Sequence, residues 1–225
     1  MATAKTLLEL ARSQLGVKES PPDSNRVKYN AAYYGREVSG EAYPWCCAFQ
    51  WWLFREAGAE ALFFGGEKTA SCTALYNYYR GRGQAVEPSQ AQPGDLVFFV
   101  FDGGKSGGMN HIGLCESVEA GYITTIDGNT GTTNEANGGA VMRRRRAMKY
   151  VGGVVRPAYT EEEEGMKIYH YVQDMPAWAQ KAATKAIRGG VIKMDETGAV
   201  NVWECNLQPL VWMDRAGLLD KPATK

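Results

Sequence analysis

Long apolar runs are missing from this 225-residue chain. No segment approaches the length of a membrane-spanning helix, so we expect no insertion into a membrane. Residues 1–15 carry Lys5, Glu9 and Arg12 instead of an unbroken apolar core, so we expect no signal peptide. The chain is therefore expected to be made in a reducing cytoplasm.

Net charge is also missing, because 25 basic residues balance 25 acidic ones. This balance argues against wholesale attraction to nucleic acid. Charge is concentrated locally in a basic run, Arg143–Arg146, and an acidic run, Glu161–Glu164. We interpret the basic run as an edge strand with both faces in solvent; the alternative is attraction to an anionic polymer.

A framework of paired cysteines is not present either. The five cysteines are odd in number and contain no C-x-x-C pair, which excludes a small disulfide-stapled fold and the usual zinc motifs. We expect no metal and no cofactor. The cysteines are Cys46, Cys47, Cys72, Cys115 and Cys205.

Helical patterns come first along the chain and strand patterns follow. Helices are predicted over residues 4–15, 45–57 and 71–79. Strands are predicted over residues 95–101, 111–118, 122–127, 141–148 and 151–155. Helices followed by an antiparallel meander are typical of an α+β domain.

The end of the chain has a different character. Residues 159–165 form an acidic linker without apolar periodicity, which separates a first domain, 1–158, from a small unit, 166–225. Helices over 176–187 and 207–216 make this unit mainly helical.

Four polar residues form an ordered set that suits nucleophilic catalysis. Cys46 stands at a helix start, where the helix dipole favours a thiolate. His111 begins a strand after a glycine-rich turn, where we expect an exposed imidazole that serves as a base. Asp127 and Asn129 lie two apart on the next strand, so both should face His111. Each feature alone is more often structural; the order of all four indicates a papain-like cysteine hydrolase.

Several segments resemble the CHAP domain, the cysteine- and histidine-dependent amidohydrolase/peptidase family, over residues 3–158. They are GVKESP at 16–21, PWCCAFQWW at 44–52, PGDLVF at 93–98, HIGLC at 111–115, IDGNTG at 126–131, and Arg156-Pro157.

The resemblance implies a papain-like fold of N-terminal helices packed on an antiparallel meander. It implies Cys46 as nucleophile, His111 as base, and Asp127 and Asn129 as supporting residues. Family members often have glutamate where Asp127 stands. Residues 18–43 lack a calcium-loop pattern, so no calcium is expected.

The family resemblance also implies a substrate, bacterial peptidoglycan. The bond cut is either the amide between muramic acid and L-alanine or a bond within the stem or cross-bridge peptide. Tyr43 and Trp45 are expected to line the cleft. An endolysin-like enzyme would be made in the bacterial cytoplasm and act on the wall after release.

Residues 166–225 weakly resemble one S-layer-homology repeat, through Trp178-Ala179 and Gly190-Val191-Ile192. We expect this unit to bind the wall or to self-associate, and His170 to pack within it. Two rival functions remain for the whole chain: an intracellular amidase acting on a small amide, and a wall-binding module without catalysis.

Overall fold

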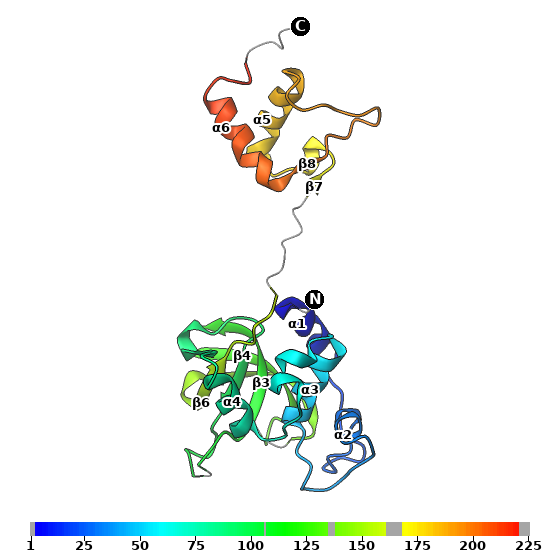
Figure 1. Cartoon of the computed structure of the whole chain (residues 1–225), viewed down its shortest axis with the longest axis vertical. Coiled ribbons are helices and arrows are strands. Elements are labelled where there is room, and N and C mark those ends of the chain that lie inside the picture. Colours follow the sequence, from blue (N-terminus) through cyan, green and yellow to red (C-terminus); the bar gives the residue numbers. More distant parts are fainter. Residues whose placement is uncertain (1–2, 106, 135–137, 161–167, 221–225) are drawn as a thin grey trace. The chain divides into compact units, whose positions relative to one another are not determined.

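The computed structural model describes residues 3–105, 107–134, 138–160 and 168–220. The chain divides into two compact units, Met1–Glu161 and Glu162–Lys225 (Figure 1). Of the linker predicted at 159–165, residues 161–165 lie outside the described residues, and the run Glu161–Glu164 lies there too.

The first unit begins with four helices, three of which follow the predicted helical segments closely. They are α1 (Ala4–Ser13), α2 (Lys28–Tyr34), α3 (Cys46–Glu56) and α4 (Cys72–Arg80). The side chains of Thr3 and Ser71 accept hydrogen bonds from the first turns of α1 and α4, which satisfies backbone donors at those helix starts. Only α2 is not predicted from the sequence.

The strands form one six-stranded antiparallel sheet, which confirms the α+β class. They are β1 (Ala85–Val86), β2 (Leu96–Phe99), β3 (His111–Glu119), β4 (Tyr122–Thr130), β5 (Ala140–Ala147) and β6 (Val151–Val155). Their order is β1-β6-β2-β3-β4-β5, so β2 to β5 form the expected meander. The last strand departs from it, because β6 returns to pair with β2 and leaves β5 at the edge. An apolar strand such as Val151–Val155 gains more burial between two neighbours than at an edge.

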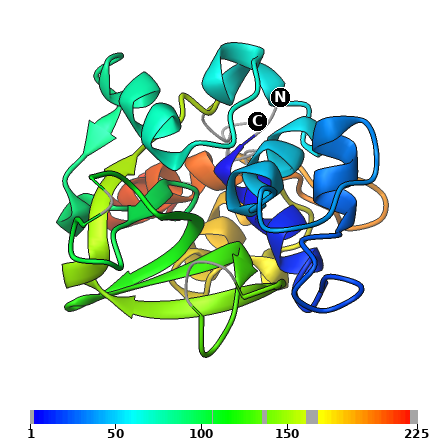
Figure 2. The ribbon, with the colours of Figure 1, turned by 90° about the horizontal axis from the view of Figure 1, so that it is seen from below.

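The main core lies between the sheet and the helices, which gather on one side of the strands (Figure 2). Helix α3 packs on β3 and β4, and Phe49, Phe54, Leu114 and Ile126 are fully buried there. Full burial of one such side chain stabilises the fold by roughly 1.5–3 kcal/mol. Alternate strand residues, Val97 and Phe99 among them, form a smaller cluster.

Two of the quoted motifs meet in the sheet. Arg156 donates hydrogen bonds from Nε and Nη2 to the two carboxylate oxygens of Asp95 at 2.8 and 2.9 Å. A bidentate pair of this kind fixes geometry as well as charge. It fastens the end of β6 to the start of β2, whose neighbour β3 begins with His111.

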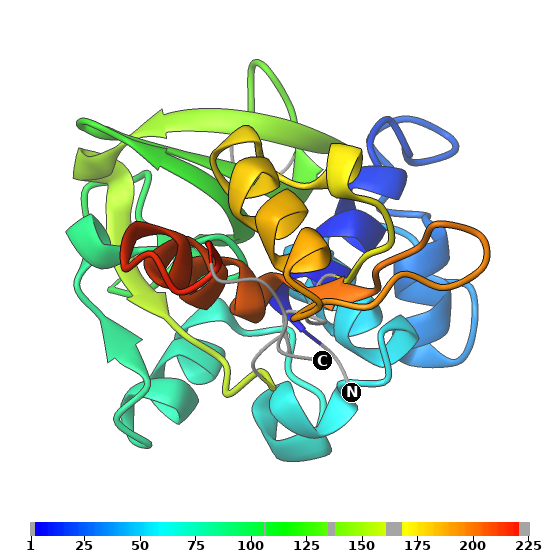
Figure 3. The ribbon, with the colours of Figure 1, turned by 90° about the horizontal axis from the view of Figure 1, so that it is seen from above.

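The second unit has its own small core. It contains β7 (Ile168–Tyr169) paired with β8 (Val202–Trp203), and the helices α5 (Ala177–Arg188) and α6 (Leu207–Arg215), which lie against each other (Figure 3). Small residues of α5 pack against Leu207 and Leu210 of α6. Within the described ranges, no helix combines the length and the hydrophobicity needed to cross a membrane.

Candidate active site

Cys46 is the first residue of α3, as the sequence predicts. Trp45 precedes it with φ −120° and ψ 18°, outside the helical region, so the helix starts abruptly at the cysteine. The first-turn N–H groups of a helix have no partner within the helix and favour a negative charge. The Cys46 side chain is only 4% exposed, so a thiolate there is stabilised by the protein and little by water.

His111 begins β3 and lies fully buried, which corrects the expectation of an exposed imidazole. The ring stays inside because Phe99 and Phe101 pack around it, with ring centroids 6.2 and 6.0 Å away. Its Nε2 lies 2.9 Å from Oδ2 of Asp127. Nδ1 makes no hydrogen bond of ordinary geometry within the described residues, which leaves it available to Cys46.

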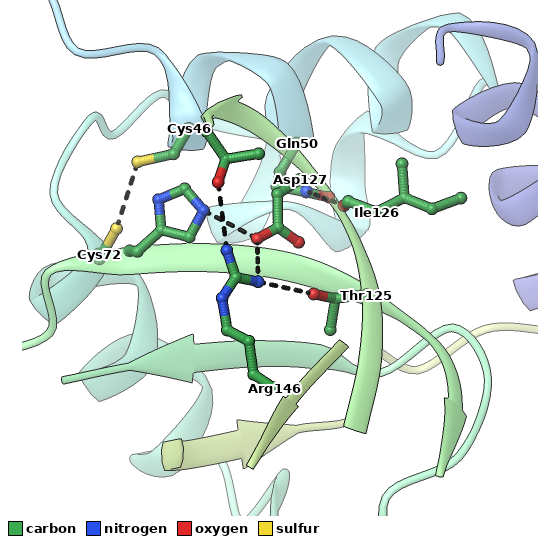
Figure 4. Close-up of polar contacts among 9 residues, drawn as sticks. Cys46, Gln50, Cys72, Thr125, Ile126, Asp127 and Arg146 are labelled. Atoms are coloured by element: carbon green, nitrogen blue, oxygen red, sulfur yellow. Dashed lines mark hydrogen bonds and ion pairs between the residues drawn. The ribbon is translucent and has the colours of Figure 1, made fainter. Parts of the chain in front are cut away.

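The carboxylate oxygen of Asp127 that contacts His111 also accepts a hydrogen bond from Arg146 of β5. Nη1 of Arg146 lies 2.5 Å from Oδ2 of Asp127, and the guanidinium also donates to Thr125 and Thr130 at 3.2 Å (Figure 4). Its centre lies 4.7 Å above the ring of Phe99.

The interpretation of the basic run as wholly solvated is therefore wrong for Arg146, which is 4% exposed. Strand β5 does form the edge, but its alternation sends Arg143 and Arg145 outward and Arg146 inward. Side chains along a strand alternate between its two faces, and this alternation could have shown from the sequence that Arg146 is buried while Arg145 is exposed.

The pKa values of the site follow from these contacts. Burial alone would lower the pKa of His111, but hydrogen bonds and charges of Asp127 and Cys46 raise it to about 9. Burial would raise the pKa of Asp127, and the charge of Arg146 and the hydrogen bond from His111 more than offset it, so the pKa is lowered. Hydrogen bonds from Cys47 and Cys72 lower the pKa of Cys46 well below its usual value, and His111 lowers it further.

Asn129 is also buried, but it does not join this network. Its side-chain amide has no hydrogen-bond partner within the described residues. The pairing of β4 with β5 shifts register between Asp127 and Thr130, and Asn129 has φ +58°, so the two-residue alternation that would align Asp127 with Asn129 is interrupted. The supporting role of Asn129 stays a prediction.

The two aromatic residues expected to line a cleft differ in exposure. Tyr43 is half-buried and reaches the surface. Trp45 is fully buried, and its indole donates to Oε1 of Glu19 at 2.7 Å. It stacks on Tyr29 at 5.5 Å, so it packs under the helix start and does not line a cleft, which corrects that expectation.

The thiol of Cys46 lies in a cluster with two further thiols, those of Cys47 and Cys72. Sγ of Cys72 lies 3.7 Å from Sγ of Cys46 and 3.3 Å from Sγ of Cys47 (Figure 4 shows the first pair). All three sulfurs lie within 4.8 Å of one another, a spacing that could also hold a thiophilic metal ion. Sequence spacing does not reveal this cluster, because Cys72 comes from a different helix.

Comparison with known proteins finds one family whose sequence model matches part of the chain. Residues 38–129 match the sequence model of the CHAP domain. No characterised protein sequence matches the chain.

The solved structures that match the chain are distant. An endolysin, LysIME-EF1, is 15% identical with a TM-score of 0.43, over 76% of this chain and 70% of that one. Ly7917 is 17% identical with a TM-score of 0.40, over 69% of this chain and 62% of that one. An NlpC/P60 family protein from Bacillus cereus ATCC 10987 is 17% identical with a TM-score of 0.39, over 69% of this chain and 40% of that one. The chain thus spans less than two thirds of the length of the last two.

Proposed function

We propose that the CHAP domain to which residues 38–129 belong makes this chain a peptidoglycan hydrolase, which cuts an amide bond with Cys46 as nucleophile and His111 as acid and base. One observation carries the proposal. The Cys46 thiol, the His111 imidazole and the Asp127 carboxylate converge from α3, β3 and β4 inside the matched segment, with His111 bonded to Asp127 at 2.9 Å.

The first half of the reaction acylates the enzyme. The Cys46 thiolate attacks the carbonyl carbon of the amide, and the negative charge moves onto the carbonyl oxygen. The first-turn N–H groups of α3 are suited to stabilise that oxyanion. The His111 imidazolium then gives its proton to the leaving amine, and a thioester remains on Cys46.

The second half frees the enzyme. Neutral His111 takes a proton from water as the water oxygen attacks the thioester carbonyl, and the carboxylic acid leaves Cys46 as a thiolate. Asp127 touches no reacting atom in this scheme. It is a positioning residue that holds Nε2 of His111, so that Nδ1 faces the sulfur.

The substrate bond is either the muramoyl-L-alanine amide or a bond of the stem or cross-bridge peptide. An endolysin-like enzyme of this kind acts on the wall after release from the cell that made it. His111 and Asp127 form a buried ion pair, which is costly to maintain in a fold. A wall-binding module without activity does not require such a pair, so its presence favours a catalytic role.

The test is digestion of purified peptidoglycan by the reduced protein, with new amino groups and sugar termini identified by mass spectrometry. Cys46→Ala should abolish release of fragments. Cys47→Ala is the matched control and should keep most activity, because consecutive helical residues point about 100° apart and only one can face His111. Equal losses in the two variants would overturn the assignment of the nucleophile, and an inactive wild-type protein would overturn the proposed function.

A further inference from the structure

The cluster of three thiols exceeds what amide hydrolysis requires, because one thiolate suffices for that reaction. Cys46 and Cys72 are each the first residue of a helix, α3 and α4, so two helix N-termini meet at the pair. Cys47 is fully buried beside them. All three are free thiols.

We propose that Cys46 and Cys72 form a reversible oxidation site, in which a hydroperoxide oxidises Cys46 and Cys72 closes a disulfide with it. That this modification switches hydrolysis off rests on the proposed function, whereas formation of the disulfide does not.

The first step oxidises the sulfur by two electrons. The Cys46 thiolate attacks one peroxide oxygen, the O–O bond breaks, and an S–O bond forms to give the sulfenic acid. The other oxygen leaves with the electron pair and takes a proton as water or an alcohol.

The second step forms the cross-link. The Cys72 thiol loses its proton and its sulfur attacks the sulfenic sulfur. An S–S bond forms, the S–O bond breaks, and the hydroxide leaves as water. A dithiol reductant returns both thiols and is itself oxidised to a disulfide.

Geometry excludes one of the other two pairs, and the order in which the thiols react argues against the second. Adjacent residues such as Cys46 and Cys47 have Cα atoms about 3.8 Å apart, below the usual range of about 4.4–6.8 Å for a disulfide. Cys47 and Cys72 are close at 3.3 Å, but contact with Cys46 raises the pKa of each well above its usual value, so neither is the first to react. Cys46 and Cys72 need to close from 3.7 Å to about 2.05 Å, a shift on the scale of side-chain rotation.

The disulfide protects Cys46 from further oxidation as well as switching hydrolysis off. A sulfenic acid without a neighbouring thiol is oxidised further to sulfinic and sulfonic acids, which reductants do not reverse. With Cys72 in contact, the nucleophile is stored as a disulfide and recovered on reduction.

The test exposes the reduced full-length chain to hydrogen peroxide, blocks remaining thiols with iodoacetamide, and maps the peptides by mass spectrometry without reduction. We expect a cross-link between Cys46 and Cys72, two fewer free thiols, and recovery of both with dithiothreitol. In Cys47→Ala, where the assignment is unambiguous, the same cross-link should form. In Cys72→Ser, Cys46 should gain two or three oxygen atoms that dithiothreitol does not remove.

Cys115→Ala is the control, because Cys115 is buried away from the cluster on the other sheet face and its loss should leave the cross-link intact. A wild-type protein that keeps all its thiols, links Cys47 to Cys72, or couples two chains through Cys205 would overturn the proposal. These measurements use no substrate, so their failure is distinct from failure of the proposed hydrolysis.

Discussion

Single residues of the site form a row of alternating charges: the Cys46 thiolate, the His111 imidazolium, the Asp127 carboxylate and the Arg146 guanidinium. Each of these side chains is at most 4% exposed. A buried charge is costly unless it is paired, and here each charge faces one of opposite sign, so the four sum to zero. Removing any member leaves the next one uncompensated.

The pH dependence of hydrolysis should reflect this row. The pKa of His111 is raised to about 9, so the imidazolium is fully present below its unfolded value of 6.5 and is lost as pH rises through about 9. The pKa of Cys46 is lowered, so the thiolate persists well below its usual range. We expect kcat/KM to be flat around neutral pH and to fall on the alkaline side near pH 9. The measurement is a rate profile from pH 5 to 11.

An Asp127→Asn variant supplies the control for that profile. Without the carboxylate, the imidazolium loses its main support, so the alkaline limb should move to lower pH and the rate should fall by roughly 10²–10⁴-fold. If the variant keeps the alkaline limb of the profile at the same pH and has a normal rate, the positioning role belongs to Asn129 instead.

Arg146 is predicted to be a positioning residue that acts through Asp127. Arg146→Met keeps much of the side-chain volume but leaves the Asp127 carboxylate buried with one partner fewer, at a cost of about 3–5 kcal/mol in the free energy of unfolding. The pKa of Asp127 should then rise, and the acidic limb of the rate profile should move to higher pH.

The matched control is Arg145→Met on the same strand, since Arg145 faces solvent and pairs with Glu119 at 3.2 Å. Such an exposed pair contributes little to stability. Equal effects of the two substitutions on unfolding and on the pH profile would contradict the role given to Arg146.

At the scale of elements, close approach between β3 and β4 explains why glycine follows His111-Ile112. A Cβ atom at Gly113 would stand 2.0 Å from Oδ1 of Asp127 and 2.8 Å from Cβ of Thr125. Gly128 serves a similar purpose on β4, where a Cβ would lie 2.6 Å from Cβ of Phe49 on α3. These two positions let the helix and both strands converge on the thiol.

Gly113→Ala should therefore damage the site as well as the fold. We expect a loss of about 1–3 kcal/mol in the free energy of unfolding from overpacking, with a larger loss of activity because the Asp127 carboxylate is displaced. Denaturant unfolding and peptidoglycan digestion measure the two effects. Gly81→Ala, at the end of α4 with an ordinary helical φ, is the control and should leave activity unchanged.

At the scale of the whole molecule, the second unit leaves large apolar side chains in solvent. Trp178 and Trp212 are 55% and 60% exposed, and Val191 is 53% exposed. Leu207, Leu210 and Val211, by contrast, lie in the core of that unit. Tryptophan is enriched at interfaces between proteins relative to the rest of the surface.

We predict that the second unit anchors the enzyme to the wall or joins two copies, and takes no part in bond cleavage. A chain truncated after Thr160 keeps Tyr159, whose hydroxyl donates to the carbonyl of Gly94 at 2.8 Å, so the first unit stays complete. It should match the full chain on a small soluble peptide but bind whole walls roughly a hundredfold more weakly, or become monomeric.

Three measurements decide this prediction: light scattering, wall pull-down and lysis. Trp178→Ala in the full chain separates a surface effect from loss of the whole unit. If the truncated and full chains have the same oligomeric mass, bind walls equally and lyse them equally, the second unit has neither proposed role.

The amino-acid sequence predicted the α+β class, nearly every helix and the meander from β2 to β5. It did so because apolar periodicity and turn residues are local properties of the chain. It also singled out Cys46, His111 and Asp127, since their order and their neighbours form motifs.

Contacts between side chains that are distant in the sequence could not be predicted in this way. The return of β6 to β2, the inward turn of Arg146, the burial of Trp45 and His111, and the contact of Cys72 with Cys46 all depend on packing between elements far apart in the chain. The prediction for Asn129 assumed regular alternation of side chains along β4. A local irregularity in the pairing of that strand interrupts the alternation. Contacts of this kind arise from the shape of the whole core, and no local pattern of residues encodes them.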